Sequence, residues 1–472
     1  MYTGVYLGLV LFFFYRIVCC YPAQFSTPTP RLKTRHYNLA ASRVSILRTP
    51  RTSETMDFSL NDHQTLIRDT VRQFMDAEVR PTVKQRDREE RFPSEEIAKL
   101  AELGCCGMMT PEEWGGPGLD TLSYVLMLEE VARVDAGMAT SLGVTNSAVQ
   151  IPLLKFGTEA QKQKYLRRLA TGEIIGSFCL TEPAAGSDAA GIQARAVATA
   201  RVGAGLGVRS SPAPAFAPAA GASWAGAPLG TPSGDIYKLN GTKTWVSNGS
   251  VAGLFLVFAK TDPDAGGKGI TAFLVEPSFP GFHVGRHEDK MGQRSSPAVE
   301  VLLNDCEVPR ENRLGEEGQG LKIALSTLDG GRIGIGALAL GLAQGALDES
   351  IKYAKQRRAF GKAIGEFQGI QWMLADMQTE IEAARGLVYH AAWLKDHHPS
   401  KLGSAASKAK LYASEMANRV VYKAVQIHGS SGYSRETEVE RMYRDARVVS
   451  IYEGTSEIQR MIIARDLLGA KV

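Results

Sequence analysis

The sequence predicts an α+β protein with a helical N-terminal domain, a central β-barrel or β-sandwich domain and a C-terminal helical bundle. Three observations predict this architecture. Apolar residues recur at helical spacing over residues 56–175. Short β-rich segments separated by Gly, Pro, Asn and Asp then fill residues 176–312, a pattern typical of a barrel or sandwich. Long helical periods with short joints return over residues 313–472, which indicates a bundle.

A chain of 472 residues exceeds the size of a single hydrophobic core, so several domains are expected. The formal net charge of +4 comes from residues 1–55, which carry seven Lys and Arg but one acid. In the rest of the chain acidic residues outnumber basic ones by two, so no basic footprint favours binding to nucleic acid. The six cysteines show no C-x-x-C spacing and the histidines no H-E-x-x-H, so neither a disulfide framework nor a metal site is expected.

Residues 1–55 differ in composition from everything after them. An apolar run that begins at Val5 ends at Arg16 and is too short to span a membrane. Arg and Ser are frequent, and the first acid is Glu54, a composition typical of an organelle transit peptide. A secretory signal fits less well because no basic residue precedes the apolar run, and a non-native extension before a true start at Met56 is a further alternative. A transit peptide implies the mitochondrial matrix; without one, a cytoplasmic protein is expected.

The N-terminal domain begins with a helix that Asn61 and Asp62 precede and Pro81 stops. The apolar positions of this helix are Leu66, Ile67, Val71, Phe74, Met75 and Val79. Further helices are predicted over residues 94–103, 121–134, 138–156 and 158–171. The Gly- and Pro-rich residues 110–118 are expected to form a loop.

The central domain is predicted to contain strands over residues 174–181, 236–239, 244–247, 254–260, 270–276, 283–286 and 299–308. Asn240-Gly241 is a hairpin signal between two of them. The C-terminal helices are predicted over residues 318–357, 366–396, 404–427 and 454–468.

Residues 200–234 interrupt the β region. Of these 35 residues, 26 are Ala, Gly, Pro or Ser, and none is Asp, Glu or Lys. The segment has too few large apolar side chains to order itself by burial. Its removal would leave a strand-to-strand connection of ordinary length, so we interpret it as a surface-loop insertion or a retained non-coding segment. A role in interactions is a further alternative.

The rest of the chain is organised around residues 451–460, Ile-Tyr-Glu-Gly-Thr-Ser-Glu-Ile-Gln-Arg. Gly454 breaks what precedes it, and Thr455 or Ser456 can cap the first free N–H groups of a helix. Glu453 is therefore expected on a loop just before a helix N-terminus. Apolar residues of this helix recur at Ile458, Met461, Ile462, Leu467 and Leu468. Taken alone, a carboxylate at this place could serve only the helix dipole.

Together with residues 443–447, Tyr-Arg-Asp-Ala-Arg, this segment resembles the C-terminal signature of the acyl-CoA dehydrogenases. The resemblance runs from about Met56 to the C-terminus, apart from residues 200–234. It implies that Glu453 is the base that removes the proton alpha to a thioester carbonyl, polarised by the Glu453 backbone N–H and a ribityl hydroxyl of FAD. It also implies that Thr455 and Glu457 reach FAD and that Gly454 lies at the substrate.

Residues 178–188, Phe-Cys-Leu-Thr-Glu-Pro-Ala-Ala-Gly-Ser-Asp, resemble the family's T-E-P-x-x-G-S-D motif. The small residues expose backbone N–H groups, which suit a flavin edge and a phosphate. The resemblance implies that Phe178, Leu180 and Thr181 contact the flavin and that Ser187 serves both FAD and the substrate. From the residues alone, the stretch could be a plain β-turn.

Residues 240–248, Asn-Gly-Thr-Lys-Thr-Trp-Val-Ser-Asn, resemble the family segment whose Trp-x-Thr/Ser unit packs on the isoalloxazine ring. The resemblance implies that Trp245, Val246 and Ser247 form a wall of the flavin site. An indole can stack on a flat ring, although Trp245 could also be a core residue.

Residues 329–332, Asp-Gly-Gly-Arg, resemble the family segment near the acyl-CoA, which implies that Asp329 and Arg332 bind the substrate. A guanidinium can fork onto an acceptor or stack on a flat ring, although Arg332 could also form a surface ion pair. One branch of the family, the isovaleryl-CoA dehydrogenases, places its base at the position of Gly331. Glycine has no carboxylate and Glu453 is present, so the chain resembles the other branch.

Residues 356–362 and 367–368 resemble a family segment that reaches FAD across a subunit interface. The resemblance implies that Arg357 holds the pyrophosphate, with Phe360 and Gln368 nearby, although the arginine could also be a solvated helix end.

Residues 426–433 resemble the family's Q-I-x-G-G-x-G-Y loop, which implies FAD contacts from Gln426, Gly429 and Ser430. Ser430 replaces the second Gly, so a close backbone approach there would change.

Residues 328–335 and 343–347 most resemble the short-chain acyl-CoA dehydrogenases. The implied activity is FAD-dependent α,β-dehydrogenation of a short-chain acyl-CoA to the trans-2-enoyl-CoA, with electrons passed to electron-transfer flavoprotein by a homotetramer. One alternative is a flavin oxidase or monooxygenase of the same fold. Another is a non-catalytic relative disabled by residues 200–234.

Overall fold

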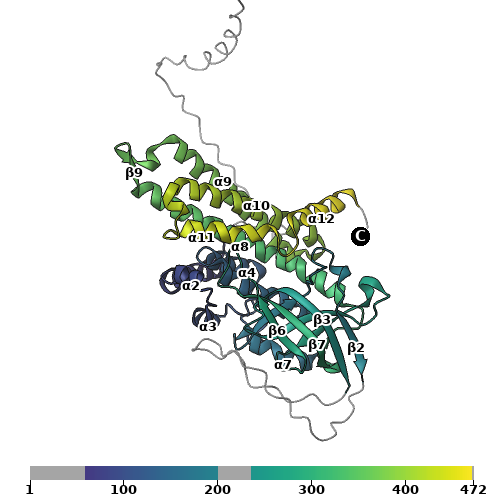
Figure 1. Cartoon of the computed structure of the whole chain (residues 1–472). Helices are drawn as coiled ribbons and strands as arrows, with labels where there is room; N and C mark the ends of the chain where they lie inside the picture. Colours follow the sequence, from purple (N-terminus) through teal and green to yellow (C-terminus); the bar gives the residue numbers. More distant parts are fainter. Residues whose placement is uncertain (1–58, 200–234, 470–472) are drawn as a thin grey trace, which may run out of the picture. The chain divides into compact units, whose positions relative to one another are not determined.

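The computed structural model describes residues 59–199 and 235–469. The expectations for residues 1–55 and 200–234 therefore lie outside the described residues. The predicted α+β fold is confirmed, because N-terminal and C-terminal helices flank a central mixed sheet (Figure 1).

The N-terminal segment is helical throughout. Its helices are α1 (Asp62–Phe74), α2 (Val83–Glu89), α3 (Ser94–Glu102), α4 (Thr121–Ala132), α5 (Ala136–Gly143), α6 (Ile151–Phe156) and α7 (Glu159–Ala170). The predicted helix over residues 138–156 consists of α5 and α6 joined by π-helical Val144–Gln150. Among the predicted apolar positions of the first helix, Leu66 is 63% exposed. Val71, another of these positions, is buried and packs in the core next to α4.

The strands form one mixed sheet. They are β1 (Ile175–Cys179), β2 (Arg195–Thr199), β3 (Ile236–Ser247), β4 (Ala252–Lys260), β5 (Ile270–Val275), β6 (Phe282–His287), β7 (Ala298–Pro309) and β8 (Arg313–Leu314). Their order is β6-β7-β3-β2-β4-β5-β8, and β1 pairs in parallel with β4. Side chains of β4 alternate between two apolar cores, Phe255 and Val257 in one, Leu254 and Leu256 in the other. The second core includes α7, so helices cover that face of the sheet.

The hairpin predicted at Asn240-Gly241 is wrong. Both residues lie inside β3, which pairs with β7 on both sides of a register shift between Leu239 and Gly241. The Asn240 side chain bonds across the strands, its Nδ2 donating to Asp305 Oδ1 at 2.9 Å. A Cβ on Gly241 would lie 2.7 Å from Ala194 Cβ, so the glycine permits a close approach at a bulge instead of forming a turn.

The C-terminal segment consists of α8 (Gly320–Gln356), α9 (Gln368–His397), α10 (Leu402–His428), α11 (Glu438–Ala446) and α12 (Ser456–Leu468). A small ribbon, β9 (Arg358–Ala359) and β10 (Lys362–Ala363), follows α8. Helix α11 was not predicted, because its buried apolar positions Val439, Met442 and Ala446 lie among charged residues. Of the predicted apolar positions of α12, Ile458 and Ile462 are half-buried, whereas Met461, Leu467 and Leu468 are exposed. The fully buried residues of this helix are Ser456 and Gln459.

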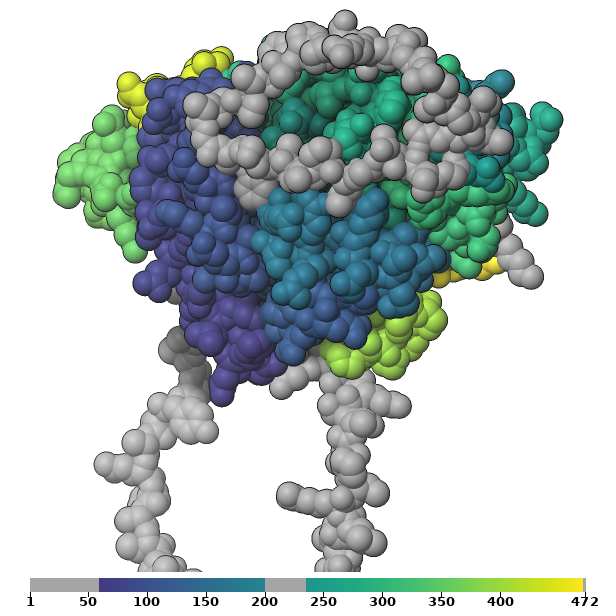
Figure 2. Space-filling model, turned by 90° about the horizontal axis from the view of Figure 1, so that it is seen from below, coloured from purple at the N-terminus to yellow at the C-terminus, as the bar shows by residue number. Residues whose placement is uncertain are grey.

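The N-terminal and C-terminal helices share one hydrophobic core, which runs from α1 and α4 through α8, α9 and α10. Of the described helices, α8 has a length and apolar composition compatible with a membrane span, and most of its apolar stretch is buried in this core. Figure 2 shows the N-terminal helices directly beside the β domain on one face of the molecule. Helix α11 also packs in the shared core, through Val439, Met442 and Ala446. The loop that follows α11 therefore starts from an anchored helix.

Candidate active site

Glu453 lies in the loop between α11 and α12, in left-handed backbone conformation with φ of 55°. The next residue, Gly454, has φ of 90°. Thr455 then caps α12, its Oγ1 accepting from Ile458 N at 3.4 Å. The predicted place of Glu453, just before a helix N-terminus, is confirmed. A left-handed non-glycine residue costs about 1–2 kcal/mol, so surrounding contacts must hold this turn.

The Glu453 carboxylate lies against Gly331 of α8. A Cβ on Gly331 would lie 2.9 Å from Glu453 Cδ and would collide with Oε2. Glu453 Oε2 is buried, and no hydrogen-bond partner for it exists among the described residues. A buried carboxylate oxygen without a partner destabilises the ionised form.

Two cationic side chains face this carboxylate. Burial raises the pKa of Glu453 to about 7, while the charges of Arg332 and Lys410 act in the opposite direction. A carboxylate whose pKa lies near neutrality is a stronger base than an exposed one and is still substantially ionised.

Arg332 is buried beside Glu453 and forms an ion pair with Asp329 one turn earlier in α8. The surface ion pair considered as an alternative is therefore wrong for Arg332. Its Nε is buried and has no hydrogen-bond partner among the described residues. Burial also raises the pKa of Asp329, against the effect of Arg332. The Arg332–Asp329 pair thus leaves Arg332 Nε as a donor unpaired in the described part of the chain, beside Glu453, where the acyl-CoA substrate is expected.

Two further residues of the site were not predicted, Lys410 of α10 and Gln459 of α12, and both are completely buried. Lys410 Nζ donates to Gly454 O at 2.8 Å, and Gln459 Nε2 donates to the same oxygen at 2.9 Å. A signal for Lys410 was present, because it shares the helical spacing of the buried residues Ala406, Ala413 and Ala417. A lysine on an apolar stripe needs a specific acceptor.

A buried polar network lies beside the loop that carries Glu453. Gln293 Nε2 donates to the Tyr452 hydroxyl at 3.3 Å, and Gln293 Oε1 accepts from Thr140 Oγ1 at 2.7 Å. The Gln293 backbone N–H donates to Asp445 Oδ1 at 2.5 Å. Arg441 Nη1 in turn donates to Asp445 Oδ2 at 2.9 Å. These contacts join α5, the β domain and α11 next to Glu453.

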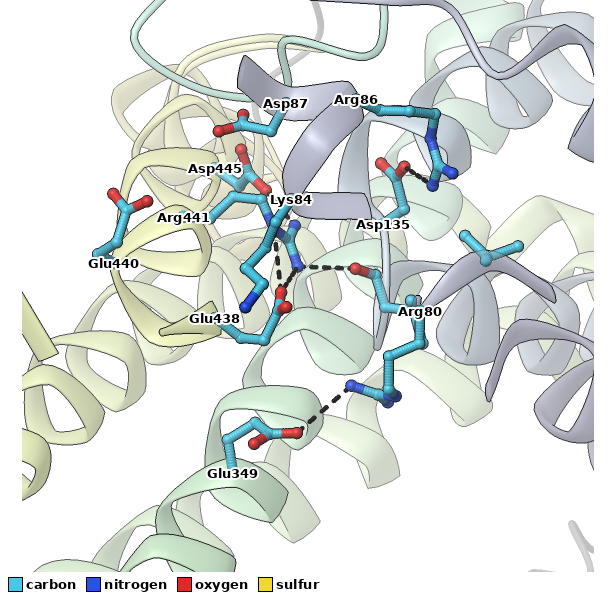
Figure 3. A network of polar contacts seen from close by, with 12 residues as sticks. Arg80, Lys84, Arg86, Asp87, Asp135, Glu349, Glu438, Glu440, Arg441 and Asp445 are labelled. Atoms are coloured by element: carbon cyan, nitrogen blue, oxygen red, sulfur yellow. Dashed lines mark hydrogen bonds and ion pairs between the residues drawn. The ribbon is translucent and has the colours of Figure 1, made fainter. Parts of the chain in front are cut away.

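Figure 3 shows how Arg441 extends this network toward the N-terminal helices. Its Nη2 donates to Val134 O at 2.8 Å. It also donates to Glu438 Oε2 at 2.9 Å (Figure 3). Nearby, Arg86 of α2 pairs with Asp135 at 3.2 Å. Burial raises the pKa of Asp445 to about 6, with Arg441 opposing the shift.

The expected flavin wall comes together beside the β1 end. Thr244 N donates to Thr181 O at 2.9 Å, which places residues 180–181 next to Trp245 and Ser247. Trp245 is 59% exposed with φ of 57°, so the alternative that it is a core residue is wrong. Its open indole beside backbone groups fits a planar cofactor. Val246 and Leu180 are buried, while Ser187 is exposed.

A buried ion pair that the sequence analysis missed holds this motif. Lys243 Nζ donates to Glu182 Oε1 at 2.8 Å and to Leu180 O at 3.1 Å. Glu182 also accepts from the backbone N–H groups of Gln193 and Ala194, at 2.6 Å and 3.0 Å. Phe178, which was also predicted to contact the flavin, packs its ring against Phe258, with ring centroids 5.1 Å apart.

The flavin wall and the base are connected through α5. Asn248 Nδ2 donates to Ser141 O at 3.1 Å, and the neighbouring Thr140 Oγ1 lies 3.5 Å from the Tyr452 hydroxyl. Glu453 directly follows Tyr452, so hydrogen bonds through α5 connect the flavin wall to the base.

Six predicted cofactor residues lie elsewhere, near the C-terminal end of α8. They are Arg357, Phe360, Gln368, Gln426, Gly429 and Ser430, and all are exposed. Tyr353 joins the two segments, because its ring stacks on His428 with centroids 4.3 Å apart. In Figure 1, β9 lies at the opposite end of the C-terminal helices from α12. Within one chain, these residues are therefore not brought to Glu453.

Among the described residues, no group of three or more His, Cys, Asp or Glu side chains is arranged to hold a metal ion. The described cysteines, Cys105, Cys106, Cys179 and Cys306, are free and buried. The site described above offers the carboxylate of Glu453, the cations Arg332 and Lys410 beside it and the exposed indole of Trp245.

Family models match most of the chain. The model "Acyl-CoA dehydrogenase, N-terminal domain" matches residues 61–173, the middle-domain model residues 218–306 and the C-terminal-domain model residues 318–468. The mitochondrial short-chain specific acyl-CoA dehydrogenase of Mus musculus is 43% identical, covering 86% of this chain and 90% of the mouse protein.

Two solved structures are also similar. Butyryl-CoA dehydrogenase of Megasphaera elsdenii is 43% identical with a TM-score of 0.78, covering 88% of this chain and 100% of that one. A chain in the structure of the electron transferring flavoprotein of Acidaminococcus fermentans is 44% identical with a TM-score of 0.79, over 88% and 100% of the two chains.

Proposed function

The chain belongs to the acyl-CoA dehydrogenase family and is an FAD-dependent oxidoreductase, and we propose that it dehydrogenates short-chain acyl-CoA thioesters with Glu453 as the base. The relatives named as short-chain specific and as butyryl-CoA dehydrogenase support this substrate class. The observation that carries the proposal is the orphaned Glu453 Oε2, held against Gly331 with a pKa of about 7.

The chain's own groups account for the proton transfer. Glu453 takes the proton alpha to the thioester carbonyl, and the developing enolate needs a donor at its oxygen. Within the described residues no acceptor pairs with the Glu453 backbone N–H, so this group remains available for that oxygen. FAD supplies the acceptor for the beta hydrogen, which leaves as hydride, so that the trans-2-enoyl thioester forms.

An anaerobic titration with butyryl-CoA tests the proposed substrate. Bleaching of the flavin absorbance is expected, and a flavin-loaded protein that does not bleach would exclude butyryl-CoA as a substrate. Oxygen consumption during turnover separates the alternative, a flavin oxidase of the same fold, from a dehydrogenase.

We also propose that electron-transfer flavoprotein accepts the electrons and that the protein is a homotetramer. Electron-transfer flavoprotein as acceptor is supported by the similar chain from the Acidaminococcus fermentans structure. A homotetramer is supported by the six exposed cofactor residues near α8, among which Phe360 is 95% exposed in the part of the chain that the structure describes. Sedimentation of the FAD-loaded protein tests the assembly.

The location follows from residues 1–55. If they are a transit peptide, the protein lies in the mitochondrial matrix, as the name of the mouse relative supports; otherwise it is cytoplasmic. Fusing residues 1–55 to a fluorescent protein tests this, because import into mitochondria is expected for a transit peptide.

A further inference from the structure

Lys410 is a completely buried cation for which no ion pair exists among the described residues. Within residues 59–199 and 235–469, its Nζ makes one hydrogen bond, to Gly454 O at 2.8 Å. An ammonium has three donors, and its burial is strongly unfavourable unless an anion offsets the lost hydration. Burial lowers the pKa of Lys410, and of the acids that oppose this shift Glu453 has the largest effect.

Gln459 makes an informative comparison with Lys410. Its Nε2 donates to Gly454 O at 2.9 Å and to Glu453 O at 3.3 Å, and it is buried to the same degree. Two donors, one charged and one neutral, therefore converge on a single carbonyl. This carbonyl directly follows the left-handed residue Glu453, so both donors hold the turn that aims the carboxylate.

The titratable groups that face Glu453 come from three helices, and two of these helices supply a charge. Arg332 of α8 and Lys410 of α10 are the cations that act on it, and Tyr124 of α4 faces it as a neutral phenol. Glu415 and Glu457 act on Lys410. Arg332 is already paired with Asp329, whereas Lys410 forms no ion pair with an acid in the described part of the chain.

We propose that Lys410 is a positioning residue whose ammonium holds the Glu453–Gly454 turn and supplies the counter-charge that keeps the Glu453 carboxylate ionised. The inference rests on the proposed function, in which Glu453 is the base. Gln459 shares the tethering role and lacks the electrostatic one. Burial lowers the pKa of Lys410 to about 8, so the ammonium persists over the neutral range in which the base works.

The test compares Lys410→Met with Gln459→Met in the FAD-loaded full chain. Each variant removes one donor to Gly454 O, but only the first removes a charge. The pH dependence of kcat/KM for butyryl-CoA is the measurement. In Lys410→Met the midpoint of the acidic limb is expected to rise by about one pH unit or more, since a nearby opposite charge shifts a pKa by that amount. In Gln459→Met the midpoint is expected to stay and the plateau to fall.

Lys410→Gln is the second variant, because it keeps a donor to Gly454 O and loses the charge. Its midpoint is expected to rise as in Lys410→Met, and Lys410→Arg is expected to restore the wild-type midpoint. An unshifted midpoint in both neutral variants, or an equal shift in Gln459→Met, overturns the inference. If Glu453→Gln retains normal turnover, the proposed function itself fails, which is a different outcome from an unshifted Lys410 variant.

Discussion

The carboxylate of Glu453 occupies the space that a side chain at Gly331 would need, because a Cβ there would collide with Oε2. A base on the loop and a base on α8 at this position therefore exclude one another. The glycine has a steric role that its sequence position alone does not reveal.

Glu453→Gln is expected to lower turnover by about 10²- to 10⁴-fold, the typical contribution of a positioned general base. The amide has nearly the shape of the carboxylate, so FAD content is expected to be unchanged. Flavin bleaching by butyryl-CoA is the measurement. Glu102→Gln, at an exposed position of α3, is the matched control and is expected to behave as wild type.

Gly331→Ala is expected to reduce turnover strongly while retaining FAD, since its methyl group displaces the Glu453 carboxylate. Gly330→Ala is the control at the neighbouring position, where the nearest atom, Lys395 Nζ, lies 3.7 Å from a built Cβ. That control is expected to keep its activity and to gain up to about 1 kcal/mol of stability from helix propensity. Equal activity of the two variants would contradict the predicted contact.

The pH profile of kcat/KM is expected to rise through about pH 7, because Glu453 accepts a proton only when ionised and its pKa is about 7. Steady-state rates from pH 5 to 9 check this. A profile that is flat down to pH 5 would show that the carboxylate is not buried as described.

The same raised pKa affects stability with a defined sign. The folded state holds the Glu453 proton more tightly than the unfolded chain, so this group's contribution to stability falls as pH rises from about 4.5 through about 7. Glu453→Gln removes this loss. The melting temperature of the variant is therefore expected to exceed that of wild type at pH 8, with a smaller difference at pH 5.

Trp245→Ala is expected to weaken FAD binding by roughly 2- to 13-fold, the equivalent of the 0.5–1.5 kcal/mol typical of an aromatic pair. Trp245→Phe retains a flat ring and is expected to bind FAD nearly as wild type. Because Trp245 is exposed, the stability of the apoprotein is expected to be unaffected. Flavin fluorescence titration measures the affinity, and an unchanged value for Trp245→Ala would remove the indole from the flavin wall.

Replacing residues 200–235 by a two-residue turn is expected to preserve FAD binding and turnover. Thr199 and Ile236 are direct antiparallel partners in β2 and β3, so the segment leaves and re-enters the sheet at one place. Shortening such a closure from about 35 residues to a few stabilises the fold by about 2 kcal/mol. Flavin content and melting temperature are the measurements, and loss of FAD would show that the segment belongs to the site.

The sequence by itself determined the order of helical and β segments, because hydrophobic periodicity is local. It also identified Glu453 and its place before α12, since Gly454 and Thr455 encode the turn and the cap within a few residues. The hairpin predicted at Asn240-Gly241 is wrong for a tertiary reason. The local sequence is that of a turn, but pairing with β7 and the close approach of Ala194 make it a bulge.

Only the tertiary structure decided what surrounds Glu453. Gly331, Lys410 and Gln459 come from three helices far apart in the chain, and no local pattern shows that they converge on one turn. The pKa of the base likewise depends on burial and on charges from other helices. Long-range packing sets both the surroundings of Glu453 and its pKa. It fixes which side chains exclude water from the carboxylate and which cations lie beside it.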